Sequence, residues 1–286
     1  MHLSLRKQEA IAGYGFIALW VVGFIVFLFL PLIRNGLLSL TDAVLVQQGE
    51  PQYIGMANYM EAFTLDVEFT PHLLHTLRNL VVDVPVILAF ALVVALLAMQ
   101  RVPGRTIFRA IFFLPVVIGS SVVVGHMFDT AGNQVVLFRG AEMQQFLQIY
   151  LGEHLPAFLT FLNRSIFVLW RSGVQILIFI AGLKGIDPAL YEAARVDGAS
   201  AWSSFWKITL PMLSPVMLVN VVYTIIDSFT DYFNEVMYYI RMVTFRISLR
   251  LGYPSALGNI YFVIIFALVL LVFVVLGRVT FYRGER

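Results

Sequence analysis

From Leu190 to Pro211 the chain reads L-Y-E-A-A-R-V-D-G-A-S-A-W-S-S-F-W-K-I-T-L-P, a polar stretch between two segments apolar enough to span a bilayer. Asp187 and Pro188 just before it are typical of a helix start, because Asp accepts free backbone N–H groups and Pro fits the first helical position. Gly198 stands where a left-handed residue would end that helix, and Ser200 can cap a second one. The stretch therefore predicts two short helices with a glycine turn, lying at a membrane surface.

The composition around this stretch predicts a membrane protein. Hydrophobic residues make up 60 % of the 286 residues and charged ones 13 %, against about 25 % charged in an ordinary soluble domain. The mean hydropathy is +0.86. The formal net charge of +2 does not indicate a nucleic-acid partner, and the absence of cysteine excludes disulfides and thiolate metal sites. We expect no metal site and no soluble globular domain.

Long apolar runs predict an all-α, polytopic membrane protein with about six transmembrane helices. The first run is too long for a cleavable signal peptide and is read as the first transmembrane helix. The whole chain, 1–286, is predicted to be a single transmembrane domain. The six expected spans are Tyr14–Ile33, Leu80–Met99, Ile107–Phe128, Ile166–Leu183, Pro211–Tyr232 and Ile260–Leu276.

Basic residues predict the orientation of these spans. Cytoplasmic loops carry an excess of Lys and Arg, and that excess falls on both termini, on the loop after the second span and on the loop at 184–211. The first two loops on the other side are rich in Asp and Glu. Both termini and the 184–211 loop are therefore expected in the cytoplasm. The last outer loop does not follow this pattern, since it holds Arg241, Arg246 and Arg250.

The 184–211 loop resembles the cytoplasmic "EAA" loop of ABC importer permeases. The matching residues are Glu192-Ala193-Ala194, then Gly198 after three residues, Ile208 after nine more, and Leu210-Pro211. Two further segments resemble sugar permeases: Gly55-Met56-Ala57-Asn58-Tyr59, and Gly104-Arg105-Thr106-Ile107-Phe108-Arg109 with Leu114-Pro115. The likeness covers most of the chain and departs after Asp231, where N-E-V-M-Y-Y-I-R replaces the usual G-G-P segment.

On this resemblance, the chain is identified as a member of the binding-protein-dependent (MetI-like) permease family, in its carbohydrate-type (maltose/glycerol-phosphate permease-like) branch. The family fold implies a peripheral first helix at about 14–33 and a permease core at about 75–280. The loop would dock on a separate ATPase chain. The alternative from the residues alone is an amphipathic connector in the lipid interface, which would suit Trp202 and Trp206. The coupling residues that the resemblance implies are Tyr191, Glu192, Ala193, Ala194, Arg195, Asp197, Gly198, Ile208, Leu210 and Pro211.

Polar residues recur at three- and four-residue intervals along the fifth span, so they share one helix face. Ionisable residues inside a bilayer usually face a cavity, although polar side chains also join neighbouring membrane helices. The family resemblance places the fourth and fifth spans along the translocation path. Asp83, Ser120, Ser121 and His126 are expected to be local hydrogen-bonding groups. The candidate path residues are Arg171, Gln175, Asn220, Thr224, Asp227, Ser228 and Asp231.

The leading hypothesis is a permease subunit of an ATP-driven importer for a sugar or oligosaccharide, located in the cell inner membrane. The chain lacks the phosphate-binding G-x-x-x-x-G-K-[ST] motif, so no cofactor is expected in it, and ATP and Mg²⁺ would bind to the ATPases. The expected partners are a second, homologous permease in a heterodimer, two ATPase subunits, an extracytoplasmic binding protein and membrane lipid. Two alternatives are an intramembrane enzyme that pairs Asp227 with Asp231, and a secondary transporter or channel that acts alone.

Overall fold

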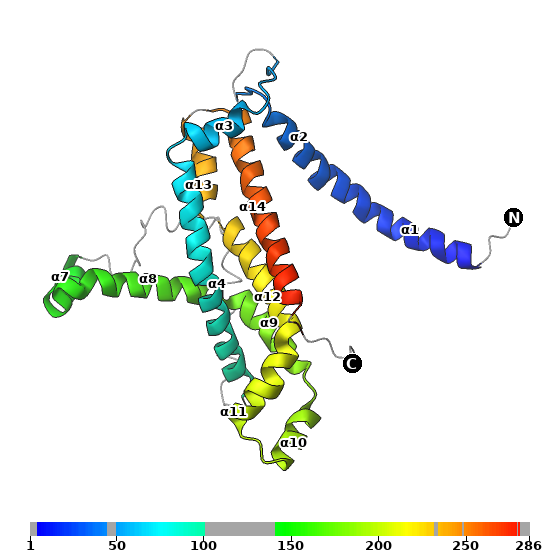
Figure 1. The fold of residues 1–286 in the computed structure, drawn as a ribbon, viewed down its shortest axis with the longest axis vertical. Coiled ribbons are helices and arrows are strands. Elements are labelled where there is room, and N and C mark those ends of the chain that lie inside the picture. The colour runs from blue at the N-terminus through cyan, green and yellow to red at the C-terminus, as the bar shows by residue number, and fades with distance from the viewer. Residues whose placement is uncertain are drawn as a thin grey trace. The chain divides into compact units, whose positions relative to one another are not determined.

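The structure, a computed structural model, describes residues 5–44, 50–100, 141–231, 234–247, 249–278 and Thr280. These residues are almost entirely helical, and the extended pairings among them are two isolated β-bridges, Thr41–Tyr53 and Val44–Arg250. The prediction of an all-α chain is therefore confirmed. The helices, labelled as in Figure 1, are α1 (Leu5–Phe24), η1 (Ile25–Phe29), α2 (Leu30–Leu38), α3 (Ala57–Thr64), α4 (Phe69–Met99), α7 (Ala141–Leu151), η3 (Gly152–His154), α8 (Leu155–Arg171), α9 (Gly173–Lys184), α10 (Pro188–Val196), α11 (Ala201–Ser204), η4 (Phe205–Thr209), α12 (Leu210–Thr230), α13 (Glu235–Met242), η5 (Val243–Ile247) and α14 (Gly252–Gly277).

Within the described residues, four helical stretches are long and apolar enough to cross a membrane, and a bent helix pair could make a fifth. The first is Gly13–Leu38, and none of its most apolar window is buried within the chain. The predicted second and sixth spans began too late, because α4 starts at Phe69 and α14 at Gly252. The fifth corresponds to α12. The third predicted span, at 107–128, lies outside the described residues.

The predicted fourth span, Ile166–Leu183, is not one helix. α8 ends at Arg171 and α9 begins at Gly173, with Ser172 between them at a ψ of −4°. The sequence contained a signal for this break, because Arg171, Ser172 and Gly173 interrupt the apolar run. Arg171 consequently stands at a helix end.

Two wide helical turns precede prolines near the start of a helix. A proline lacks an N–H and its ring crowds the carbonyl four residues earlier, so the turn before it opens to a π-helical register. At η1 the Leu30 N–H bonds the Ile25 carbonyl, one residue before Pro31. At η4 the Leu210 N–H bonds the Phe205 carbonyl, one residue before Pro211. Both prolines therefore stay within continuous helical segments.

The contacts divide the chain into two compact units, one of residues 1–73 with 238–264 and one of residues 74–237 with 265–286. The single domain over 1–286 stays a prediction. In the first unit, the Gly55–Tyr59 segment has a structural role. Gly55 adopts a φ of +61°, and the buried Asn58 side chain donates to the carbonyls of Ser39 and Thr41 at 2.8 and 2.9 Å. The Tyr59 hydroxyl bonds the Ser39 hydroxyl at 2.8 Å.

The same unit holds a network of charged and phenolic side chains. Arg250 donates to both carboxylate oxygens of Glu61, at 2.6 and 2.8 Å, and to the Asn58 amide oxygen at 3.1 Å. The Asp66 carboxylate accepts hydrogen bonds from the hydroxyls of Tyr253 and Tyr239. Burial by itself would raise the pKa of Asp66, but the hydrogen bonds from these two tyrosines and from nearby backbone N–H groups lower the pKa below its ordinary value.

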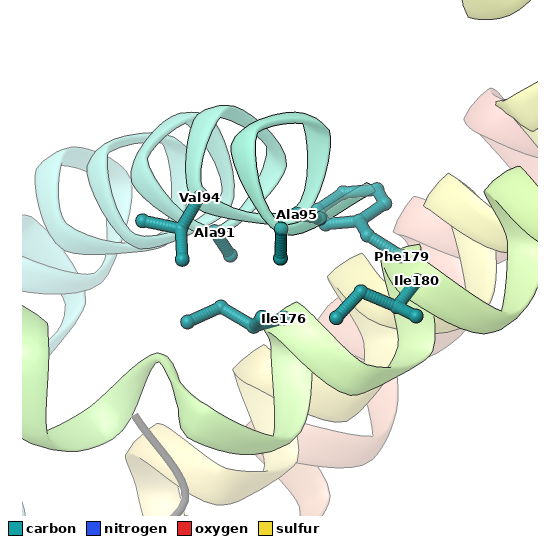
Figure 2. Close-up of a cluster of buried hydrophobic side chains, with 7 residues drawn as sticks. Ala91, Val94, Ala95, Ile176, Phe179 and Ile180 are labelled. Carbon is teal, nitrogen blue, oxygen red and sulfur yellow. The ribbon is translucent and has the colours of Figure 1, made fainter. Parts of the chain in front are cut away.

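The core of the second unit lies between α4 and α9, and Figure 2 shows its side chains facing one another across the two helices. On α4 the buried positions are Ala91, Val94, Ala95 and Ala98, which share one helix face. Small residues on that face let the backbones approach closely, as is common between membrane helices. The partners on α9 are Ile176, Phe179 and Ile180.

α9 also packs tightly on α12. A Cβ atom at Gly182 would lie 2.8 and 2.9 Å from the Val216 methyl carbons and 3.0 Å from a Leu213 methyl carbon, so only glycine fits there without displacement. Further along, the Asn220 side chain donates to the backbone carbonyl of Gln175 at 3.1 Å. These two contacts fix α9 and α12 against each other.

Candidate functional site

The loop at 184–211 forms the two helices predicted from its capping residues. The Asp187 carboxylate accepts the Ala189 N–H at 3.0 Å at the start of α10, and the Ser200 hydroxyl accepts the Ser203 N–H at 3.2 Å at the start of α11. Gly198 has a φ of +76°, as the sequence predicted. α9 and α10 meet at a bend of 63°.

A Schellman motif closes α10. The Ala199 N–H bonds the Ala194 carbonyl at 2.8 Å and the Gly198 N–H bonds the Arg195 carbonyl at 3.1 Å. This is the paired 6→1 and 5→2 pattern that satisfies the last carbonyls of a helix. The helix end is therefore defined by hydrogen bonds rather than frayed.

One face of α10 is exposed and uncharged except at its centre. Ala189, Glu192, Ala193 and Val196 lie three or four residues apart, so they share that face. All four are exposed, and Val196 is 88 % exposed. Arg195, Asp197 and Gly198 are exposed as well, whereas Ala194 is half-buried. The face offers small side chains and one carboxylate to a surface outside this chain.

A hydroxyl pair joins α10 to the wide turn before α12. The Tyr191 hydroxyl lies 2.9 Å from the Thr209 hydroxyl, and Tyr191 is half-buried while Thr209 is buried. The neighbouring Ile208, Leu210 and Pro211 are half-buried. Within the described residues, Tyr191 thus braces the two arms of the loop, which is a different role from a docking contact.

Trp202 and Trp206 form an aromatic cluster with Phe205 on the second arm. The two indole rings are 5.6 Å apart, and each packs on the Phe205 ring. Trp202 is 70 % exposed and Trp206 50 %. Amphipathic rings of this kind favour the boundary between lipid and water, and a lipid-interface position for these two residues stays a prediction.

The other predicted group, at the far ends of α9 and α12, centres on Arg171. Its guanidinium Nη2 lies 3.3 Å from the Asp227 carboxylate and its Nε lies 3.3 Å from the Asp231 carboxylate. The Arg171 side chain is 9 % exposed, Asp231 18 % and Asp227 37 %. The two carboxylates offset part of the cost of removing the guanidinium from water.

A cavity of about 110 Å³ adjoins this ion-pair group. The Ser228 hydroxyl borders it and has no hydrogen-bond partner among the described residues. His75 contacts the Glu235 carboxylate at 2.8 Å on the more exposed side. Apart from Leu80, the residues that line the cavity carry polar or charged side chains: Thr76, Asn79, Asp83, Arg171, Ser228, Asp231, Asn234 and Glu235.

Four predicted path residues do not line this cavity: Asp227, which contacts Arg171 from outside the wall, and three buried residues. Gln175, Asn220 and Thr224 are fully buried. Asn220 bonds the Gln175 backbone and Thr224 bonds the Asn220 carbonyl at 2.7 Å, so both serve helix packing in this structure. The Gln175 amide and the Asn220 amide oxygen have no hydrogen-bond partner within the described residues.

The sequence reasoning missed several wall residues. Thr76 and Asn79 fell outside the predicted second span, and Glu235 was not singled out. The sequence did indicate the α4 members of this wall, because the polar residues Thr76, Asn79 and Asp83 lie three and four residues apart on one helix face. Asp83 lines the cavity rather than serving only locally, whereas Ser120, Ser121 and His126 lie outside the described residues.

Residues 69–282 match the family described as "Binding-protein-dependent transport system inner membrane component". The match covers most of the chain, and the chain belongs to this family. It is therefore a multi-pass membrane component of a transport system rather than an enzyme. A transporter that depends on a binding protein is also not one that acts alone.

Named relatives and solved structures agree with the family. The chain is 34 % identical to the probable ABC transporter permease protein YesP of Bacillus subtilis, over 80 % of this chain and 73 % of the relative. It is 28 % identical to the arabinooligosaccharides transport system permease protein AraP of the same organism, over 99 % and 93 %. A bacterial ABC transporter involved in the import of the acidic polysaccharide alginate shares the fold, with a TM-score of 0.62 at 22 % identity over 96 % and 98 % of the two chains.

Proposed function

We propose that the chain is one permease subunit of an ATP-driven importer for a sugar or oligosaccharide, and that the 184–211 loop receives the motion of the ATPases. The relatives support the solute class: the names of AraP and of a trehalose/maltose permease from Thermococcus litoralis, 28 % identical, both specify saccharides. The single observation that carries the coupling role is the exposed face of α10, capped at both ends and bent away from α9.

The docking step relies on small side chains. Ala189 and Ala193 permit close approach of the α10 backbone to a cleft, and Val196 gains by leaving water. Glu192 lies between them and can pair with a basic residue of the ATPase. None of these four residues is buried within this chain.

Transmission follows from how α9 and α12 are joined. The loop connects them at one end, where the hydroxyls of Tyr191 and Thr209 tie α10 to the turn before α12. Arg171 joins them at the other end through Asp227 and Asp231. Because Gly182 also packs on Leu213 and Val216 near the loop end of both helices, a push on α10 moves them together, and the cavity beside Arg171 moves with them. The ATPase must hold α10 differently in its two states for this coupling to work.

The assembly follows the family pattern. We propose a heterodimer with a second, homologous permease, two ATPase subunits that bind ATP and Mg²⁺, and an extracytoplasmic binding protein that delivers the solute. One solved relative of 20 % identity was captured with a periplasmic protein bound to an alginate pentasaccharide. Both termini and the 184–211 loop face the cytoplasm, as the basic residues favour.

Charge reversal on α10 tests the coupling role. Glu192→Lys should reduce solute uptake and binding-protein-stimulated ATP hydrolysis by about tenfold or more, because it places a cation against the basic partner of Glu192. The amount of chain in the membrane should not change, since Glu192 is exposed. Glu153→Lys, the same substitution at an exposed residue of η3, is the matched control. Normal uptake and normal ATPase stimulation in Glu192→Lys would contradict the proposal.

A further inference from the structure

The charge around the cavity beside Arg171 bears on which saccharides can pass. Among the described residues, its wall contains three carboxyl groups, of Asp83, Asp231 and Glu235, and one guanidinium, of Arg171. Asp227 adds a fourth carboxyl group in contact with Arg171 from outside the wall. The His75 ring lies 2.8 Å from the Glu235 carboxylate. The described wall therefore carries more carboxyl groups than guanidinium groups.

Arg171 is the group that would otherwise bind an acidic sugar. A guanidinium binds a carboxylate well when its N–H groups are available for a paired contact. Here Nη2 donates a hydrogen bond to Asp227 at 3.3 Å, Nε forms an ion pair with Asp231 at 3.3 Å without hydrogen-bond geometry, and the side chain is only 9 % exposed. A uronate carboxylate entering the cavity would have to displace one of these aspartates or lie beside it. Like charges held together in a poorly hydrated site repel each other strongly.

Neutral hydroxyl groups meet the opposite situation. The side chains of Thr76, Asn79, Ser228 and Asn234 supply both donors and acceptors. The Ser228 hydroxyl is buried and has no hydrogen-bond partner among the described residues. The carboxylates can accept hydrogen bonds from sugar hydroxyls as well. The wall therefore suits a solute that is rich in hydroxyls and carries no negative charge.

We propose that Asp227 and Asp231 set the charge selectivity of the translocation path: by occupying Arg171 they admit neutral saccharides and exclude saccharides that carry carboxylates. This inference rests on the proposed function and narrows its solute class. Asp227 and Asp231 are specificity-determining residues in this account, and Arg171 is the cation whose availability they control.

The test measures solute binding to the complete importer without its binding protein, so that the permease pathway alone selects. The probes are neutral arabino-, xylo- and malto-oligosaccharides and oligogalacturonides of matched length, bound to the wild-type complex in lipid nanodiscs. The wild type should prefer the neutral probes by about tenfold or more. Asp227→Asn/Asp231→Asn should make Arg171 available, gain oligogalacturonide binding by about tenfold, and make that binding weaken with salt. Glu153→Gln removes one carboxylate elsewhere and should behave like the wild type.

The outcomes separate this inference from the proposed function. The charge selectivity is overturned if the wild type binds both probe classes equally, or if the double variant gains no oligogalacturonide binding. Neither result contradicts the proposed function as long as the importer still takes up saccharides. If the double variant fails to assemble, Asp231→Asn alone should give a smaller gain in the same direction, and no gain again overturns it. Absence of any ATP-driven saccharide uptake by the complete wild-type importer would instead contradict the proposed function.

Discussion

The left-handed turn at Gly198 offers a quantitative test of how the loop holds its shape. A Cβ atom at this position would meet nothing within 4 Å, so substitution creates no clash. The cost of a side chain is then only that of holding an L-residue at a φ of +76°, which is about 1–2 kcal/mol. α10 has nine residues and is too short to be stable by itself. A cost of that size reduces the population of the closed turn by about 5- to 30-fold where the turn is marginally stable.

The assay compares Gly198→Asn, Gly198→Ala and Gly198→Val in proteoliposomes containing the complete importer. Asn tolerates the left-handed region, whereas a β-branched residue there is a genuine outlier. ATPase stimulation should therefore fall in the order Gly, Asn, Ala, Val, with Asn nearest the wild type. Membrane levels of the chain should be equal for all four, because no side chain packs against this position. Full stimulation in Gly198→Val, or a loss in Gly198→Asn as large as in Gly198→Val, would refute the reasoning.

Three further predictions concern contacts inside the two units. Tyr191→Phe and Thr209→Val should each weaken coupling by the free energy of one hydrogen bond, about 0.5–1.5 kcal/mol. The double variant should lose no more uptake than either single variant, because both remove the same bond. Additive losses in uptake would contradict the bracing role of this hydroxyl pair. Gly182→Leu should destabilise the chain by about 1–3 kcal/mol because it drives α9 from α12, as seen in denaturant unfolding, whereas Gly258→Leu, with nothing within 4 Å, should be nearly neutral. The pKa of Asp66 is lower in the folded chain than its ordinary value of 3.8, so its contribution to stability is present above that pH and is lost as the pH falls through the folded-state pKa. Asp66→Asn should remove this part of the acid sensitivity of thermal unfolding. The same dependence of the unfolding temperature on acid pH in Asp66→Asn and the wild type would contradict this role.

Local signals in the sequence predicted the loop well. Asp187, Pro188, Gly198 and Ser200 act through bonds to residues one to three positions away, or through their own backbone angles, so no tertiary information was needed. The apolar runs predicted most spans for a similar reason, since a bilayer imposes its thickness on each run independently. Their ends were less predictable, because α4 and α14 continue past the apolar run into polar residues.

Long-range contacts were not predictable from the pattern. The polar stripe on α12 was read as one group, but its members have different partners. Asn220 meets a backbone carbonyl of α9, whereas Asp227 and Asp231 meet Arg171 at the end of α8. The break at Ser172, which positions Arg171, was missed although Arg171, Ser172 and Gly173 interrupt the apolar run. Likewise, the partner of Arg250 is 189 residues away in the sequence.

That pairing of Arg250 has a consequence for the predicted orientation. Topology rules count basic residues one by one, and by that count Arg250 opposes the external placement of its loop. Held by both oxygens of Glu61, it contributes no net charge to the folded unit. A count of basic residues therefore overstates how strongly this loop argues against the predicted orientation, because Glu61, 189 residues away in the sequence, neutralises one of its three arginines.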